Sequence, residues 1–182
     1  MGKPRSFYYL LHPRPVVLVT SKCPNGRFNV APIAWITPVS EEPPTLALAV
    51  DKENYTYQCL ETCPELVINI PSLDMAELVM ELGSVSGRNV DKIAKFGVRT
   101  ARSSKVEPPR IEGCIGWIEC KVSQKLDVGE VGLFICEVLE YDTAPNTSTD
   151  WGWDLSRTSP LLHVGGRSFA GVGRRIFVRK RA

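Results

Sequence analysis

Residues 27–40, with the sequence RFNVAPIAWITPVS, combine side chains that could hold a flat, polar ligand. Asn29 and Thr37 offer hydrogen-bonding groups, Ala31 is small enough to let a ligand approach the backbone, and Trp35 supplies a broad apolar face. A site for a planar ligand with a polar tail needs an apolar wall and a few placed polar groups. The first residues alternate as in a strand, so a strand with a buried tryptophan also explains this stretch.

Residues 51–56 could bind an anion, because they resemble the start of a short helix that runs to about residue 61. Asp51 or Asn54 could cap this helix. Its first backbone N–H groups have no intrahelical acceptor, and together with the Thr56 hydroxyl and the Lys52 ammonium they would attract a negative group. An ordinary helix cap also accounts for these residues.

Residues 86–92 form a second candidate anion site. Ser86, Gly87 and Arg88 could hold a phosphate through a hydroxyl, a backbone N–H and a guanidinium. Asp91 is expected to cap a short helix over residues 92–96, which places Lys92 in its first turn. A cation there opposes the helix dipole, so Lys92 is expected to serve a purpose other than helix stability.

Common nucleotide-binding and nucleophile motifs are missing from the sequence. It contains neither a G-x-G-x-x-G turn nor a P-loop, and Val85 stands where a nucleophile elbow needs serine. The two histidines, His12 and His163, are expected to be surface or packing residues. If the protein is an enzyme, we expect a cofactor to carry its chemistry, and no catalytic side chain is assigned.

The cysteines do not indicate a metal site, because none of the six belongs to a C-x-x-C pair. Cys59 and Cys63 are one helical turn apart and could approach each other. We expect all six to be reduced and mostly buried. They are Cys23, Cys59, Cys63, Cys114, Cys120 and Cys136.

The composition is that of one globular domain spanning residues 1–182, with 43% hydrophobic and 23% charged residues. No apolar run approaches the roughly 18 residues that cross a bilayer, and the proline-broken start does not resemble a secretory signal, so we expect a cytoplasmic protein without a membrane partner. A net charge of +2 does not call for a nucleic-acid partner. The segment 174–182 is either a solvated basic tail or a rim that attracts a phosphorylated cofactor or a partner; its basic residues are Arg174, Arg175, Arg179, Lys180 and Arg181.

The order of the expected elements favours a mainly β fold. Strands are expected at residues 15–22, 27–36, 45–50, 66–70, 114–122 and 133–141, with strand-like character at 159–172. Thr37 and Pro38 are expected to end the second strand in a turn. Short helices at about 51–61, 72–82 and 92–96, the second capped by Ser72, are too clustered to alternate with strands. A small antiparallel β-barrel with peripheral helices fits this order.

Three pieces taken together resemble the flavin reductase-like, FMN-binding split-barrel family, and most closely its flavoredoxin branch. They are residues 29–32 running into 34–40, residues 54–56, and residues 86–88 with 91–92. The likeness covers about residues 15–173, the expected domain core. It implies a six-stranded split β-barrel with Greek-key connections, FMN as cofactor, and a homodimer with FMN near the subunit interface.

The resemblance also implies which residues contact FMN. Asn29, Trp35, Thr56 and Lys92 would touch it directly, and residues 86–88 would lie at its polar tail. Phe169 is the candidate for a C-terminal aromatic of this family, whereas the family's histidine after the hairpin loop is missing, since the loop reads Gly-Glu-Val at 129–131. The full candidate set is Asn29, Val30, Ala31, Pro32, Trp35, Thr37, Lys52, Asn54, Thr56, Ser86, Gly87, Arg88, Lys92 and Phe169.

The function that follows from this resemblance is an FMN-dependent oxidoreductase. Electrons would come from NAD(P)H or a redox protein, and the protein would be either a flavoredoxin-type carrier or a flavin reductase. The alternatives are a non-catalytic barrel that binds flavin, haem or a nucleotide, and an enzyme of the pyridoxamine-phosphate oxidase type. Nucleic-acid binding through the basic tail lacks the aromatic residues that would support it.

Overall fold

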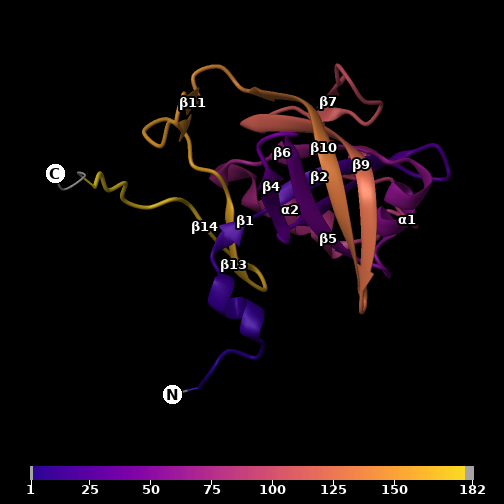
Figure 1. Ribbon diagram of the computed structural model, residues 1–182, viewed down its shortest axis with the longest axis horizontal. Helices are drawn as coiled ribbons and strands as arrows, with labels where there is room; N and C mark the ends of the chain where they lie inside the picture. The colour runs from indigo at the N-terminus through magenta and orange to yellow at the C-terminus, as the bar shows by residue number, and fades with distance from the viewer. Residues whose placement is uncertain (1, 179–182) are drawn as a thin grey trace.

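The computed structural model describes residues 2–178, in which seven strands form one antiparallel sheet (Figure 1). The strand order is β3-β2-β6-β9-β10-β5-β4, so β3 and β4 are its two edges although they follow each other in the chain. The strands are β2 (Val17–Lys22), β3 (Phe28–Ile33), β4 (Ile36–Ser40), β5 (Thr45–Asp51), β6 (Glu65–Ile70), β9 (Gly116–Val128) and β10 (Val131–Thr143).

The link between the two edge strands explains why this sheet rolls into a barrel. Only Ala34 and Trp35 separate β3 from β4, and two residues cannot cross the width of a flat seven-stranded sheet. The edges must therefore approach each other, and the backbone N–H of Ala49 in β5 donates to the Trp35 carbonyl at 2.9 Å. This arrangement confirms the mainly β split barrel, with seven strands in the sheet instead of the six expected.

The expectation of a turn at Thr37 and Pro38 is wrong. Both residues lie within β4, where Thr37 pairs with Ala47 and Pro38 with Leu46 of β5. A proline cannot donate to a strand ladder, but on an edge strand its nitrogen can face away from the partner. Pro32 and Pro38 both lie on edge strands, so neither breaks the sheet.

Two apolar cores lie on opposite sides of the barrel wall. Val17 and Val19 of β2 belong to the core inside the barrel, whereas Leu18 belongs to a second core that includes Val79 and Leu82 of α2. A strand segment that is buried on both faces reads as a continuous apolar run, as residues 17–19 of β2 do. The second core thus fixes α2 against the outside of β2 and β3.

The helices are short, and one of them differs from its expected form. They are η1 (Phe7–Leu11), α1 (Tyr55–Thr62), η2 (Leu73–Met75), α2 (Ala76–Ser84) and α3 (Lys92–Lys95). The helix expected over residues 72–82 is thus split into η2 and α2, and the Ser72 side chain makes no capping bond. Asp91 does cap α3, because its Oδ1 accepts from the Ala94 N–H at 3.0 Å.

The remaining short strands form two two-stranded sheets and one three-stranded sheet. β7 (Thr100–Ala101) pairs with β8 (Arg110–Ile111), and β11 (Ser148–Thr149) pairs with β12 (Gly152–Trp153). β1 (Arg14–Pro15), β13 (Leu162–Gly165) and β14 (Ser168–Ala170) form a separate three-stranded sheet. Figure 1 shows this sheet, together with η1, as an arm beside the barrel. Of the basic tail, Arg179, Lys180 and Arg181 lie outside the described residues.

The loop between β7 and β8, residues 102–109, is fixed by one buried carboxylate. Glu119 of β9 accepts from the backbone N–H groups of Ser104 and Lys105, and the Nε of Arg110 donates to it at 2.8 Å. Burial alone would raise the pKa of Glu119, but these donors outweigh burial and lower it. The ionised side chain therefore fastens the loop to the barrel.

The expectation that all six cysteines are reduced is wrong, because Cys23 and Cys59 form a disulfide. Cys23 follows β2 directly and Cys59 lies within α1, so tertiary packing brings the two together across 36 residues. The other four cysteines are free, and burial raises the pKa of Cys114 and of Cys136 to about 12. Within residues 2–178 no group of His, Cys, Asp and Glu side chains could hold a metal ion, and no helix there is long and apolar enough to span a membrane.

Candidate functional site

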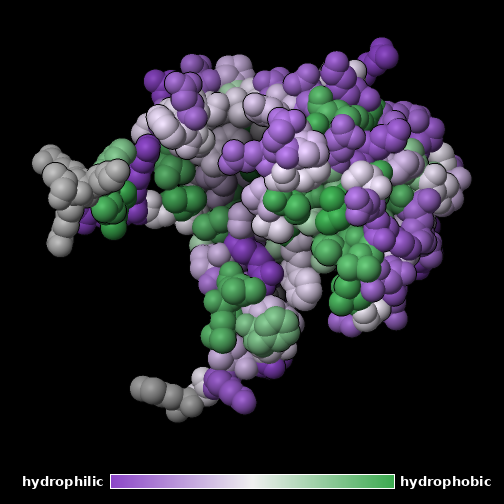
Figure 2. Space-filling model, viewed as in Figure 1, coloured by the Kyte–Doolittle hydropathy of each residue, from purple (hydrophilic) through white to green (hydrophobic). Residues whose placement is uncertain are grey.

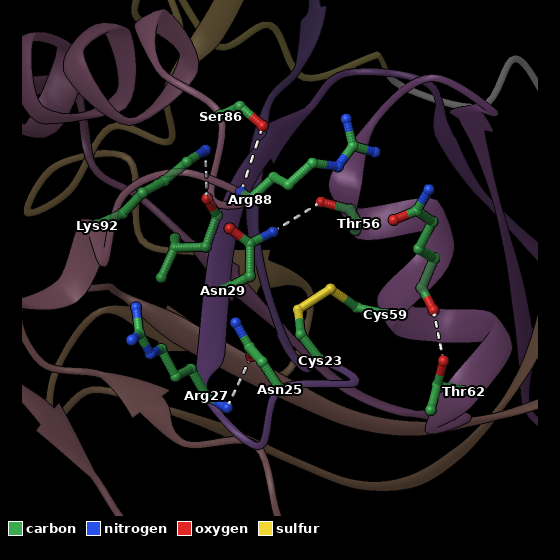
Figure 3. The surroundings of a disulfide bond; sticks show 12 residues. Cys23, Asn25, Arg27, Asn29, Thr56, Cys59, Thr62, Ser86, Arg88 and Lys92 are labelled. Atoms are coloured by element: carbon green, nitrogen blue, oxygen red, sulfur yellow. Dashed lines mark hydrogen bonds between the residues drawn. A yellow bond between two sulfur atoms is a disulfide. The ribbon is translucent and has the colours of Figure 1, made fainter.

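A cavity of about 490 Å³ opens beside β3, between the start of α1 and the loop that joins α2 to α3. Its volume lies within the range of small-molecule sites. Nine of the candidate residues line it, namely Asn29, Ala31, Pro32, Asn54, Thr56, Ser86, Gly87, Arg88 and Lys92. The three sequence pieces that are far apart in the chain thus meet at one place, around the edge strand β3 (Figure 3).

Glycines let the α2–α3 loop lie close to β3. A Cβ atom on Gly83, in the last turn of α2, would lie 3.0 Å from the Pro32 ring, and one on Gly87 in the loop would overlap the Oδ1 of Asn29. No side chain fits at Gly87 without moving Asn29 or the loop. This close contact places Ser86 and Arg88 at the rim of the cavity.

Asn29 brings an unsatisfied polar atom to the cavity. Its side chain is 4% exposed, its Nδ2 donates to the Thr56 hydroxyl at 3.0 Å, and its Oδ1 has no partner among the described residues. A buried acceptor without a donor costs about 1–3 kcal/mol. Asn29 is part of the cavity wall, and its Oδ1 lies against Gly87 of the α2–α3 loop, so a small shift of this loop would let a ligand satisfy the oxygen.

Lys92 is a buried cation at the same site. Its Nζ donates to the Val30 carbonyl at 2.9 Å and to the Leu82 carbonyl at 2.6 Å, which leaves one N–H for a ligand. Within residues 2–178 no carboxylate pairs with it, and burial lowers its pKa to about 8. An electron-rich group that enters the cavity would therefore stabilise the charged form of Lys92.

The charges at the two candidate anion positions differ. At the start of α1, the Asp51 Oδ1 accepts from the Glu53 N–H at 2.8 Å, and both of these acidic residues line the cavity. At the α2–α3 loop, the backbone N–H of Arg88 donates to the Ser86 hydroxyl, and the Arg88 guanidinium lies 5.6 Å from the centre of the Tyr55 ring. The loop is therefore the more positive end of the cavity, whereas carboxylates surround the start of α1.

Two candidate residues lie in smaller clefts next to this cavity. Trp35, 40% exposed, lines a cleft of about 370 Å³ that shares Pro32 with the main cavity. Phe169 lines a pocket of about 180 Å³ with His163, Pro32 and other residues. Both aromatic residues therefore flank β3 rather than sitting in the cavity itself.

Three further candidates lie away from the cavity. The Val30 side chain is packed in the second core, and only its carbonyl meets Lys92. Thr37 lines a separate apolar groove, because β4 is the opposite edge of the sheet. The Nζ of Lys52 donates to the Gly129 carbonyl at 3.0 Å and lies 3.8 Å from an Asp127 oxygen.

The candidate set predicted from the sequence omits several residues that line the cavity. They are Ile33, Val50, Asp51, Glu53, Tyr55, Gly83, Ser84 and Val85. Tyr55 lies between Asn54 and Thr56, which are both in the candidate set, so its position in the sequence could have identified it. The other residues of this group lie at strand ends and in or next to loops, and their positions around the cavity depend on tertiary packing.

Comparisons with known proteins identify relatives of this chain. A family model described as a flavin reductase like domain matches residues 9–171. The uncharacterized protein YddH of Escherichia coli is 30% identical over 181 residues, covering 92% of this chain and 91% of YddH. The chain is also similar in structure to the flavoredoxin of Desulfovibrio vulgaris, with a TM-score of 0.85 and 25% identity over 98% of this chain and 97% of that one. An FMN-binding domain of a flavin reductases-like enzyme from Shewanella baltica gives a TM-score of 0.81 at 24% identity, covering 94% and 93%.

The burial of Lys92 leads to a testable prediction about how the free energy of unfolding depends on pH. Because its pKa is about 8 in the folded chain and near 10.5 when unperturbed, the unfolded chain binds more protons between these values. The free energy of unfolding should therefore rise from pH 8 to pH 10.5, by roughly 1–3 kcal/mol. Substitution Lys92→Met should remove this rise, and Lys95→Met, at an exposed position of the same helix, should keep it. Urea unfolding measured at several pH values tests this prediction. An equal rise in the free energy of unfolding of the Lys92→Met variant would contradict the attribution of the rise to Lys92.

Proposed function

This chain belongs to the flavin reductase-like domain family, and on that premise we propose that it is an oxidoreductase that binds FMN in the cavity beside β3. FMN supplies the redox chemistry, accepting electrons and passing them on. The observation that carries the proposal is the unsatisfied Oδ1 of Asn29, which lies against the cavity next to the buried Lys92. The polar edge of a flavin offers both a donor for this oxygen and acceptors for the lysine.

The residues around the cavity fit the parts of FMN in a definite order. Asn29 would accept from an N–H or a hydroxyl of the cofactor, while Lys92 would donate its third N–H to an oxygen. The phosphate would lie at the loop of Ser86, Gly87 and Arg88, because the carboxylates of Asp51 and Glu53 repel it from the start of α1. The roles are those of binding and orientation, and no side chain in the set needs to act as an acid or base.

We further propose that FMN is retained as a prosthetic group rather than exchanged as a substrate. Most of the polar contacts come from buried groups, since Asn29, Thr56 and Lys92 are each no more than 5% exposed. Of these, the Asn29 Oδ1 has no partner and Lys92 keeps one N–H free, so bound FMN would satisfy both, which favours tight binding. Electrons would come from a reduced nicotinamide or from a redox protein, and the cytoplasm is the location where such donors would be available.

We also propose a homodimer with FMN near the subunit interface, and exposed apolar side chains on the arm support the dimer. Phe7, Leu10 and Leu11 of η1 are 66–78% exposed, and an apolar groove of about 610 Å³ lies along β4 and β5. Figure 2 shows apolar surface on the arm and on the neighbouring barrel. Monomers seldom expose apolar surface of this extent without a partner. Sedimentation equilibrium should give the mass of two chains, and a single-chain mass at micromolar concentration would contradict the dimer.

Absorption and turnover measurements test the function. The purified protein, or the protein after incubation with FMN, should show flavin absorption, and heating should release FMN. NAD(P)H or a reduced redox protein should bleach the bound flavin. If FMN is prosthetic, added free FMN should not accelerate NAD(P)H consumption. A protein that takes up no FMN would refute the proposal, and bound FMN that no reductant bleaches would leave a flavin-binding protein without this activity.

Two substitutions test where FMN binds. Asn29→Ala removes the side chain that faces the cavity, and Gly87→Ala keeps Asn29 but adds a methyl group that overlaps its Oδ1. Each should weaken FMN binding by roughly tenfold or more, as quenching of FMN fluorescence can measure. Asn89→Ala, at an exposed position of the same loop, is the matched control and should bind normally. Normal affinity in both Asn29→Ala and Gly87→Ala would place FMN elsewhere.

A further inference from the structure

The Cys23–Cys59 disulfide joins two elements that build the FMN cavity. Cys23 begins the turn between β2 and β3, and β3 supplies Asn29 and Pro32 to the cavity. Cys59 lies within α1, which supplies Thr56. Both cysteines are buried, with 3% and 0% of their surface exposed. The bond therefore lies behind the cavity wall rather than on the surface of the protein.

The disulfide runs beside the hydrogen bond that orients Asn29. In the β2–β3 pairing Asn29 is opposite Ser21, two residues before Cys23. In α1, Thr56 precedes Cys59 by three residues, so the two lie on the same side of the helix one turn apart. Figure 3 shows the disulfide next to the Asn29–Thr56 pair, with Lys92 and Ser86 beyond it.

These two links hold the cavity side of α1. Within the described residues, the Asn29–Thr56 hydrogen bond is the single side-chain hydrogen bond between α1 and the β2–β3 hairpin, and the disulfide is the single covalent link. The other side of α1 is tied to β9, where the Lys125 Nζ donates to the Tyr57 hydroxyl and to Glu61. Breaking the disulfide would therefore leave the Asn29–Thr56 hydrogen bond as the single side-chain link on the cavity side, while the far side stays attached to β9.

We propose that Cys23 and Cys59 form a reversible dithiol–disulfide site, reduced by a small-molecule or protein dithiol, whose oxidation state sets how tightly the cavity holds FMN. In the reduction the S–S bond breaks and both sulfurs become thiols. The dithiol supplies the two electrons and two protons and itself becomes a disulfide. The oxidised form keeps Thr56 and Asn29 in register for the cofactor, and the reduced form lets α1 move away from β3.

The coupling acts in both directions. If the disulfide increases the affinity for FMN by a given factor, bound FMN must make the disulfide harder to reduce by the same factor. An FMN-loaded protein would thus keep its disulfide at a dithiol concentration that reduces the FMN-free protein. This inference rests on the proposed FMN site, because without bound FMN there is nothing for the disulfide to control.

The test compares FMN affinity in the two oxidation states of the full chain. Alkylation after denaturation should count four free thiols before treatment with dithiothreitol and six afterwards. With the dithiol removed under argon, the FMN dissociation constant of the reduced protein should be roughly tenfold higher. Saturating FMN added before the dithiol should raise the ratio of reduced to oxidised dithiothreitol needed for half-reduction by the same factor.

Two variants separate the disulfide from other thiol effects. Cys63→Ser, which removes the free half-buried thiol one turn beyond Cys59, should keep the full difference between the oxidation states. The double variant Cys23→Ala with Cys59→Ala should bind FMN weakly whether or not dithiothreitol is added. If this variant does not fold, the wild-type comparison still decides.

The outcomes are distinguishable. Equal FMN affinity with four and with six thiols would overturn this inference and leave the proposed function intact. Six alkylated thiols before any reductant would overturn it as well. Failure to bind FMN in either oxidation state would overturn the proposed function itself, and this inference with it.

Discussion

The short connection between β3 and β4 is the constraint on which the rest of the fold depends. Two residues join strands that lie at opposite edges of a seven-stranded sheet, so the sheet must roll until its edges approach. The prolines on both edge strands remove donors from the ladder, so the barrel stays split rather than closing by hydrogen bonds. The open edge of β3 must then find other partners. Lys92 supplies one of them, because its ammonium binds the Val30 carbonyl on that edge.

Local sequence signals were enough for most of the elements. Val17, Leu18 and Val19 of β2 form an apolar run because both faces of the strand are buried there, and the Asp91 cap follows from a carboxylate placed three residues before a free N–H. The predictions failed where tertiary pairing overrode a local signal. Pro38 looked like the end of a strand because nothing in the sequence reveals that it lies on an edge, and Cys23 finds Cys59 only after α1 packs against the hairpin.

The site was predictable to the extent that its residues share an element. Asn29, Ala31 and Pro32 lie on one strand, and the 86–92 segment consists of the α2–α3 loop and the first residue of α3, so each piece enters the cavity as a unit. Thr37 was grouped with Asn29 because they are close in the chain, but the edge-to-edge link places them on opposite edges of the sheet. Lys52 was grouped with Thr56, yet its side chain turns towards the β9–β10 turn and meets Gly129. The separation of residues along the chain does not predict where Thr37 and Lys52 lie, since both positions depend on how the sheet is rolled.

The electrostatics of the cavity depend on what is buried and what is exposed. Lys92 is buried, and its two carbonyl partners neutralise only part of its charge, so it acts at short range within a medium of low polarity. Arg88 and Glu53 are exposed, and water screens both. A ligand with an electron-rich, uncharged head and an anionic tail matches this arrangement better than a compact anion would, because the phosphate can stay near solvent while the buried cation binds neutral oxygens. A flavin mononucleotide has this division of charge, which explains why a cavity lined by two carboxylates can still receive it.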